Sequence, residues 1–69
     1  MEDKVEIVTK FMSNYDEWMD YQDYTLIVAF NDGFILEREF TSGSEAYEAL
    51  EYYRNSRDTV YVLLEELYY

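Results

Sequence analysis

The 69-residue chain carries 16 Asp and Glu against five Lys and Arg, giving a formal net charge of −11, and it contains no His, Cys or Pro. A chain of this length has room for one hydrophobic core, so residues 1–69 are expected to form a single domain. The absence of Cys and His excludes disulfides, zinc fingers and the commonest catalytic nucleophiles and bases. The composition therefore predicts a protein that is not an enzyme and that holds no cofactor.

The aromatic content argues against a disordered acidic tail. Hydrophobic residues make up 49% of the chain and aromatic residues 20%, whereas disordered acidic segments are poor in aromatic side chains. No apolar run reaches the roughly 20 residues of a membrane span, and the first residues lack the basic and apolar pattern of a signal peptide. We therefore expect a folded, cytoplasmic protein. Its charge disfavours nucleic acid and membranes as direct partners and favours a basic protein.

The first half of the chain predicts strands around a segment of less regular pattern. Residues 4–12 alternate with period two, which indicates a strand. Residues 13–24 break that alternation and predict a short helix or a structured loop, with Asn14 and Glu17 as a capping box. Residues 25–30 and 34–40 flank Asn31-Asp32-Gly33, a connection typical of a bulged β-hairpin. In the second strand of this hairpin, Glu37 and Glu39 should point away from the apolar face.

The second half predicts one helix and one strand. Ser42 and Glu45 form a capping-box pattern, which predicts a helix of about three turns after it. Its inward stripe should comprise four residues, Ala46, Ala49, Leu50 and Tyr53. Asn55 and Ser56 should end the helix. Residues 59–67 are rich in β-branched and aromatic side chains and predict a last strand, with Val60, Val62 and Leu64 on one side.

These elements predict an α+β fold. The expected order is strand, short helix or loop, strand, strand, helix, strand. Such an order packs most simply as a small, largely antiparallel sheet of about four strands, with the main helix across one face.

The distribution of charge is the strongest functional signal. From Phe11 through Glu37 the chain contains six acids and no base. Acids of this kind keep small domains soluble, but net charge beyond about 8 exceeds that need and destabilises the fold by self-repulsion. Carboxylates two residues apart on a strand lie about 6.6 to 6.8 Å apart, near the phosphate repeat of a nucleic-acid strand. The candidate partner-binding residues are Asp16, Glu17, Asp20, Tyr21, Asp23, Tyr24, Asp32, Glu37 and Glu39, with Tyr21 and Tyr24 as exposed aromatic contacts.

Two chemical alternatives fit the acids less well. Asp16, Glu17, Asp20 and Asp23 cluster in sequence, but they lack the spacing of a calcium-binding loop, so no metal site is expected. A catalytic pair of carboxylates would need a cleft that 69 residues can hardly build.

In size, acidity and aromatic content the chain resembles small phage-encoded inhibitors of the DNA-mimic type, including anti-CRISPR and anti-restriction proteins and inhibitors of uracil-DNA glycosylase. The resemblance is one of character, without a shared motif. It implies an inhibitor that acts in the cytoplasm of a host cell and occludes the basic nucleic-acid-binding surface of a defence protein, such as a Cas effector or a restriction enzyme. The residues behind it are the segment 15–24 together with Glu37, Glu39, Glu45, Glu48, Glu51, Glu65 and Glu66.

A second hypothesis is a non-catalytic homodimeric interaction module or accessory protein. It would bind through an unpaired edge strand and tyrosine-rich surfaces. The two hypotheses differ in salt dependence, because attraction to a basic groove weakens as ionic strength rises, whereas an aromatic homodimer does not weaken.

Overall fold

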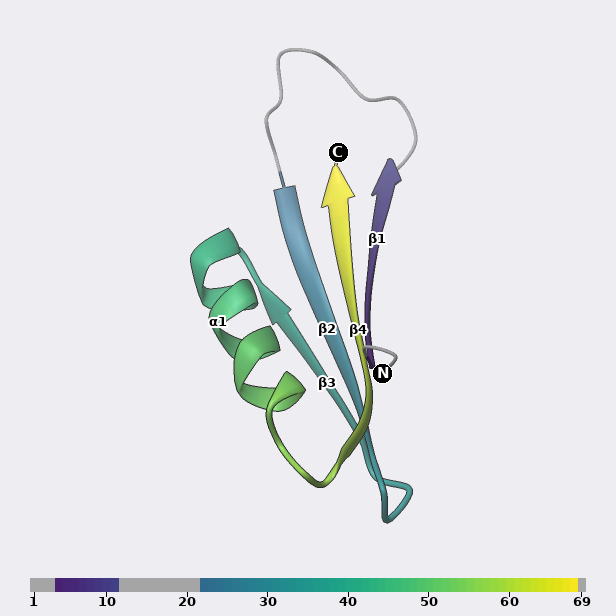
Figure 1. Ribbon diagram of the computed structural model, residues 1–69. Helices are drawn as coiled ribbons and strands as arrows, with labels where there is room; N and C mark the ends of the chain where they lie inside the picture. The colour runs from purple at the N-terminus through teal and green to yellow at the C-terminus, as the bar shows by residue number, and fades with distance from the viewer. Residues whose placement is uncertain (1–3, 12–21, 69) are drawn as a thin grey trace.

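In the part of the chain that the structure describes, four strands and one helix form the α+β fold that the sequence predicts (Figure 1). The computed structural model describes residues 4–11 and 22–68. The elements are β1 (Val5–Phe11), β2 (Gln22–Phe30), β3 (Ile35–Phe40), α1 (Gly43–Arg54) and β4 (Thr59–Tyr68). Residues 13–21 of the expected short helix or loop lie outside the described part of the chain, as does Met12 at the end of the first predicted strand. The last three residues of the expected helix or loop belong to β2 instead, because the alternation of β2 begins at Gln22.

The sheet is mixed: two strand pairs are antiparallel, as expected for a largely antiparallel sheet, and the pair of β1 with β4 is parallel. The strand order is β1-β4-β2-β3, so the last strand of the chain is inserted between the first two. β4 pairs antiparallel with β2 and parallel with β1, and in the parallel pair Val5 lies opposite Val62. The crossover through α1 connects β3 to β4, and both strands run opposite to β2. β1 runs in the same direction as β4, so these two neighbouring strands are parallel.

The hairpin between β2 and β3 has the predicted geometry. Gly33 has φ +92°, a left-handed conformation that glycine adopts without steric cost. The Phe30 N–H donates to the Phe34 carbonyl at 2.9 Å and closes the turn. The Asp32 carboxylate accepts a hydrogen bond from the Phe34 N–H at 2.9 Å, so Asp32 has a structural role in this turn.

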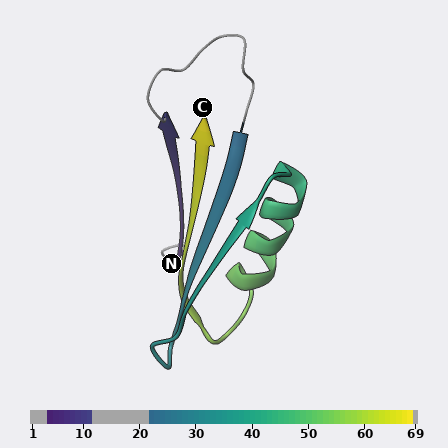
Figure 2. The ribbon, with the colours of Figure 1, turned by 180° about the vertical axis from the view of Figure 1, so that it is seen from behind.

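The core lies between α1 and one face of the sheet. Leu26 and Val28 from β2 and Val62 and Leu64 from β4 are fully buried there. Ala46 and Leu50 on α1 pack against them, and Ala49 and Tyr53 are partly buried, so the predicted helix stripe is confirmed. Figures 1 and 2 show α1 beside the β2 and β3 end of the sheet, away from β1. No helix among residues 4–11 and 22–68 is long and apolar enough to cross a membrane.

Val60 does not join the core as the alternation of β4 predicts. Ala29 pairs with Tyr61, but Phe30 pairs with Thr59, so the register shifts by one residue between them. Val60 is the extra residue of this bulge, and its side chain is 57% exposed. Thr59 is buried in its place.

The start of α1 also differs from the prediction. Ser42 is the N-cap residue, but its side chain makes no capping hydrogen bond; its Oγ lies 3.0 Å from the Oγ of Ser44. The expected capping box with Glu45 is therefore not formed. The end of α1 is as predicted, because Asn55 caps it and donates from its side chain to the Glu51 carbonyl at 2.8 Å.

Lys4 ties the start of β1 to the connection between α1 and β4. Its ammonium group donates to the Ser56 carbonyl at 2.7 Å and to the Thr59 carbonyl at 3.0 Å. The Lys4 carbonyl in turn accepts from the Val62 N–H at 2.9 Å. These bonds hold the N-terminal end of β1 at its parallel register with β4.

Gly43 permits the close approach of α1 to β2, and its substitution tests that packing. A Cβ at position 43 would lie 2.8 Å from the Tyr24 hydroxyl oxygen, so Gly43→Ala should lower the free energy of unfolding by about 1 kcal/mol through overpacking. Chemical denaturation should show a smaller loss when Gly43→Ala is combined with Tyr24→Phe, which removes that oxygen. Ser44→Ala, at an exposed neighbouring position, is the control. Equal costs of Gly43→Ala in both backgrounds would contradict this packing.

Candidate functional site

The edge strand β3 separates acidic from basic side chains. Its residues alternate between the face covered by α1 and the opposite face, on which no described element packs and which we call the uncovered face. Glu37 and Glu39 pair with Ile27 and Thr25 of β2 on the uncovered face, and both are exposed. Arg38 points to the helix side, where its guanidinium carbon lies 5.6 Å from the centre of the Phe40 ring. Glu37 and Glu39, which we call the acidic edge, therefore present charge of one sign.

Most of the basic residues are engaged within the molecule. Lys4 is bound by two carbonyl groups, and Lys10 lies 3.3 Å from a carboxylate oxygen of Glu65 on the uncovered face. Arg54 lies 3.0 Å from a carboxylate oxygen of Glu51. Neither carboxylate of the acidic edge forms an ion pair with any residue of the described segments. The negative charge at this edge is therefore not neutralised by any described basic side chain.

The predicted binding residues are divided among several places. Asp23 lies half-buried on the uncovered face of β2, on the same side of the sheet as the acidic edge. Asp32 lies in the hairpin turn. Tyr24 is 9% exposed and belongs to the core, so its expected role as an exposed contact is wrong. Four predicted residues lie outside the described part of the chain: Asp16, Glu17, Asp20 and Tyr21.

The pleat of β2 explains why Tyr24 is buried. Tyr24 shares the helix side with Leu26 and Val28, whereas Asp23 points the other way, so the two neighbours cannot contribute to one binding face. The Tyr24 ring packs edge-on against Tyr47 of α1, with ring centres 6.4 Å apart. Burial, and then the nearby Glu66 carboxylate, raise the pKa of the Tyr24 hydroxyl.

Tyr47 is held by the same carboxylate. Its hydroxyl donates to a Glu66 oxygen at 2.9 Å. Burial raises the pKa of the Tyr47 hydroxyl first, and this hydrogen bond to Glu66 raises it further. Glu66 therefore stabilises the protonated form of a tyrosine at the α1–β4 contact.

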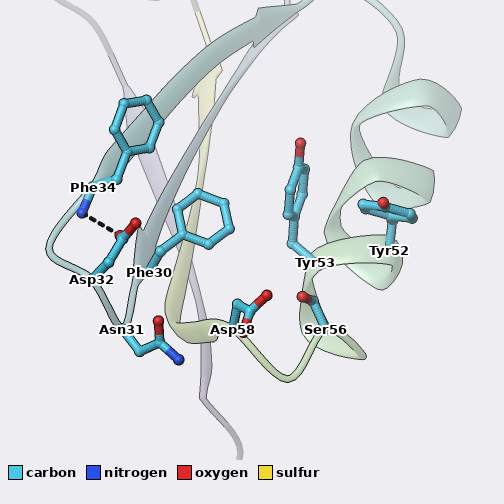
Figure 3. Close-up of a pocket in the computed structure, with 8 residues that line it drawn as sticks. All are labelled: Phe30, Asn31, Asp32, Phe34, Tyr52, Tyr53, Ser56 and Asp58. Atoms are coloured by element: carbon cyan, nitrogen blue, oxygen red, sulfur yellow. Dashed lines mark hydrogen bonds between the residues drawn. The ribbon is translucent and has the colours of Figure 1, made fainter.

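An open groove, which the sequence analysis missed, lies at the hairpin end of the molecule. It has a volume of about 630 Å³ and lies between the β2–β3 turn and the C-terminal end of α1 (Figure 3). We call it the aromatic groove; it is lined by Phe30, Asn31, Asp32, Phe34, Tyr52, Tyr53, Ser56 and Asp58. The aromatic residues 30, 34, 52 and 53 come from two separate sequence segments, and no local spacing indicates that they meet.

The rings of the aromatic groove contact one another in series. The Phe30 ring lies 6.0 Å from that of Phe34 and 6.0 Å from that of Tyr53, and the Tyr53 ring lies 5.0 Å from that of Tyr52. In Figure 3 the Phe30 ring points toward Tyr53, and Asp58 lies below the space between these two rings. Contacts between neighbouring aromatic rings favour particular orientations of one ring relative to the next.

The described residues offer no cluster suited to a metal ion. Within residues 4–11 and 22–68, no three acidic side chains come close enough to form such a site.

The raised pKa values of Tyr24 and Tyr47 predict lower stability at alkaline pH. An unfolded tyrosine ionises near its ordinary pKa of 10.0, whereas the folded protein keeps these two protonated to higher pH. Their contribution is therefore complete below pH 10.0 and is lost as the pH rises from there toward the folded pKa. Denaturation between about pH 8 and 11.5 should show a weaker decline for Tyr24→Phe and Tyr47→Phe than for the wild type. Parallel declines for all three proteins would contradict this prediction.

Comparisons with known proteins give no family assignment. No family model, no curated protein and no solved structure matches the chain significantly.

Proposed function

We propose that the protein is an acidic protein-binding inhibitor of the DNA-mimic type. It occludes the basic nucleic-acid-binding surface of a host defence protein, of the kind that anti-CRISPR and anti-restriction proteins target. It binds no nucleic acid itself and performs no catalysis.

The segregation of charge on β3 is the observation that supports this proposal. Glu37 and Glu39 lie on the uncovered face while Arg38 between them points to the helix side. Carboxylates at this spacing, about 6.6 to 6.8 Å, match successive phosphates closely enough to occupy the same Lys and Arg side chains of a partner. Asp23 lies on the same face, in the adjacent strand, and extends the negative surface.

A plainer role for the acidic edge is protection against aggregation. Charged side chains on an edge strand prevent its free backbone groups from pairing with another chain. Both roles require exposed acids on β3, but only inhibition requires that the acids increase the rate of association with a basic partner.

The uncovered face also favours the homodimer as a second candidate function. Ile27 and Leu63 pair across β2 and β4 on this face and are only half-buried, and Ile35 of β3 is 56% exposed. A second copy covering this apolar strip would form a symmetric interface. Sedimentation at low and high salt distinguishes this candidate, because such a dimer would persist or tighten at high salt.

Competition with DNA tests the proposed inhibition. Purified Cas effectors and restriction enzymes bound to labelled duplex DNA should release it when the protein is added at low salt, while the protein alone should not shift the DNA in a gel. Replacing both Glu37 and Glu39 by Gln should slow association with the responding enzyme about tenfold and reduce its dependence on salt, because exposed charges mainly set association rates.

The matched control removes the same charge from another surface. Glu45→Gln combined with Glu48→Gln changes two exposed acids of α1 and should leave the association rate near that of the wild type. Equal losses from the two double variants would show that β3 is not the binding face. Failure to displace DNA from every enzyme tested would contradict the proposed inhibition.

A further inference from the structure

The aromatic groove has a chemistry different from that of the acidic edge. It joins the hairpin turn to the connection between α1 and β4, and the Asn31 N–H donates to the Asp58 carbonyl at 2.8 Å to hold these two segments together. Figure 1 shows that the C-terminal end of α1 and the hairpin turn lie at the same end of the molecule. This hydrogen bond joins two of the segments that line the groove.

The lining combines aromatic rings with carboxylates and includes no Lys or Arg. Phe34 is 60% exposed and Tyr52 is 72% exposed, so a ligand can reach both rings, while Phe30 and Tyr53 between them are half-buried. Each of the four aromatic rings carries partial negative charge on its face and partial positive charge at its edge. A positive group over such a face is attracted electrostatically.

The carboxylates of Asp32 and Asp58 can accept hydrogen bonds from a ligand that carries several N–H or O–H groups. One oxygen of Asp32 accepts the Phe34 N–H, which orients the group. The Asp58 side chain lies at the other side of the Phe30 ring, near Tyr53 (Figure 3). An anionic ligand would be repelled by both, and a purely apolar ligand would take their oxygens out of water without replacing the lost hydrogen bonds.

We propose that the aromatic groove binds an arginine side chain presented by a partner protein. A guanidinium group is planar, so it can lie on an aromatic ring and at the same time donate hydrogen bonds to a carboxylate. A lysine ammonium is more strongly hydrated and lacks the flat surface, so it fits this combination less well. The inference rests on the proposed function for the source of the arginine, which would be a residue that otherwise contacts a nucleic-acid phosphate.

A peptide titration tests the groove without any nucleic-acid-binding protein. The probe is a short capped peptide with one central arginine, added to the ¹⁵N-labelled full chain at low salt. Chemical-shift changes should be concentrated in the amides of residues 30–34 and 52–58. The same peptide with citrulline, which keeps the shape but lacks the charge, should bind at least about fivefold more weakly, and the lysine peptide should also bind more weakly.

Two variants and two controls locate the site. Tyr52→Ala and Asp58→Asn should each weaken binding of the arginine peptide about two- to fivefold. Tyr61→Ala removes another exposed ring, on the uncovered face, and Glu48→Gln removes another exposed acid; both should bind the peptide like the wild type. Equal binding of the arginine and citrulline peptides, or shift changes centred elsewhere, would overturn the proposal.

The outcomes separate the two proposals. Arginine binding at the groove without displacement of DNA from any enzyme would support the groove and contradict DNA mimicry. Displacement of DNA with no binding of the arginine peptide would leave the inhibitor function intact and overturn the assignment of the groove.

Discussion

One helix must bury the apolar side of a four-stranded sheet, and this constraint determines most of the molecule. The alternation of β2 and β4 directs Leu26, Val28, Val62 and Leu64 to the same side, where each buried side chain contributes about 1.5 to 3 kcal/mol. Within residues 4–11 and 22–68, α1 covers this side only, and the opposite face carries half-buried apolar residues and exposed acids. The acidic edge is therefore a consequence of the same period-two pattern that builds the core.

Local patterns in the sequence predict the elements, but they do not predict how distant segments meet. The hairpin follows from Asn31-Asp32-Gly33 and the helix from its apolar stripe, because both depend on neighbouring residues. The insertion of β4 between β1 and β2 depends on pairing across the whole chain, and no local signal specifies it. The sequence pattern predicts that β2 begins at Thr25, three residues after its actual start at Gln22. Tyr24 therefore falls outside the predicted strand, and its alternation with Leu26, which accounts for its burial, is not recognised. The aromatic groove requires both the hairpin and the end of α1 to be in place, so only the tertiary structure reveals it.

The acidic edge belongs to β3, and the aromatic groove includes residues of the turn that precedes β3. The edge lies on the uncovered face and provides charge that acts over distance, whereas the groove provides contacts that act only when a side chain enters it. Phe30 and Tyr53 of the groove lie on the helix side of the sheet, so a partner that contacts both surfaces must reach around β3 at the hairpin end. In the proposed binding mode, the edge would attract a basic partner and the groove would recognise one of its arginine side chains.

The parallel pairing of β1 with β4 has a consequence for the order of folding. Val5 lies opposite Val62, and the Lys4 ammonium reaches the carbonyls of Ser56 and Thr59, so β1 depends on some of the most distant contacts in the chain. Contacts with such large sequence separation form slowly, because the loop between them must first be closed. On a ribosome, β1 emerges before β4, so its parallel pairing with β4 forms only after β4 has been synthesised. The β2–β3 hairpin can pair before then. Until β4 is available, the apolar side chains of β1, including Ile7 and Phe11, are not yet in their place in the sheet.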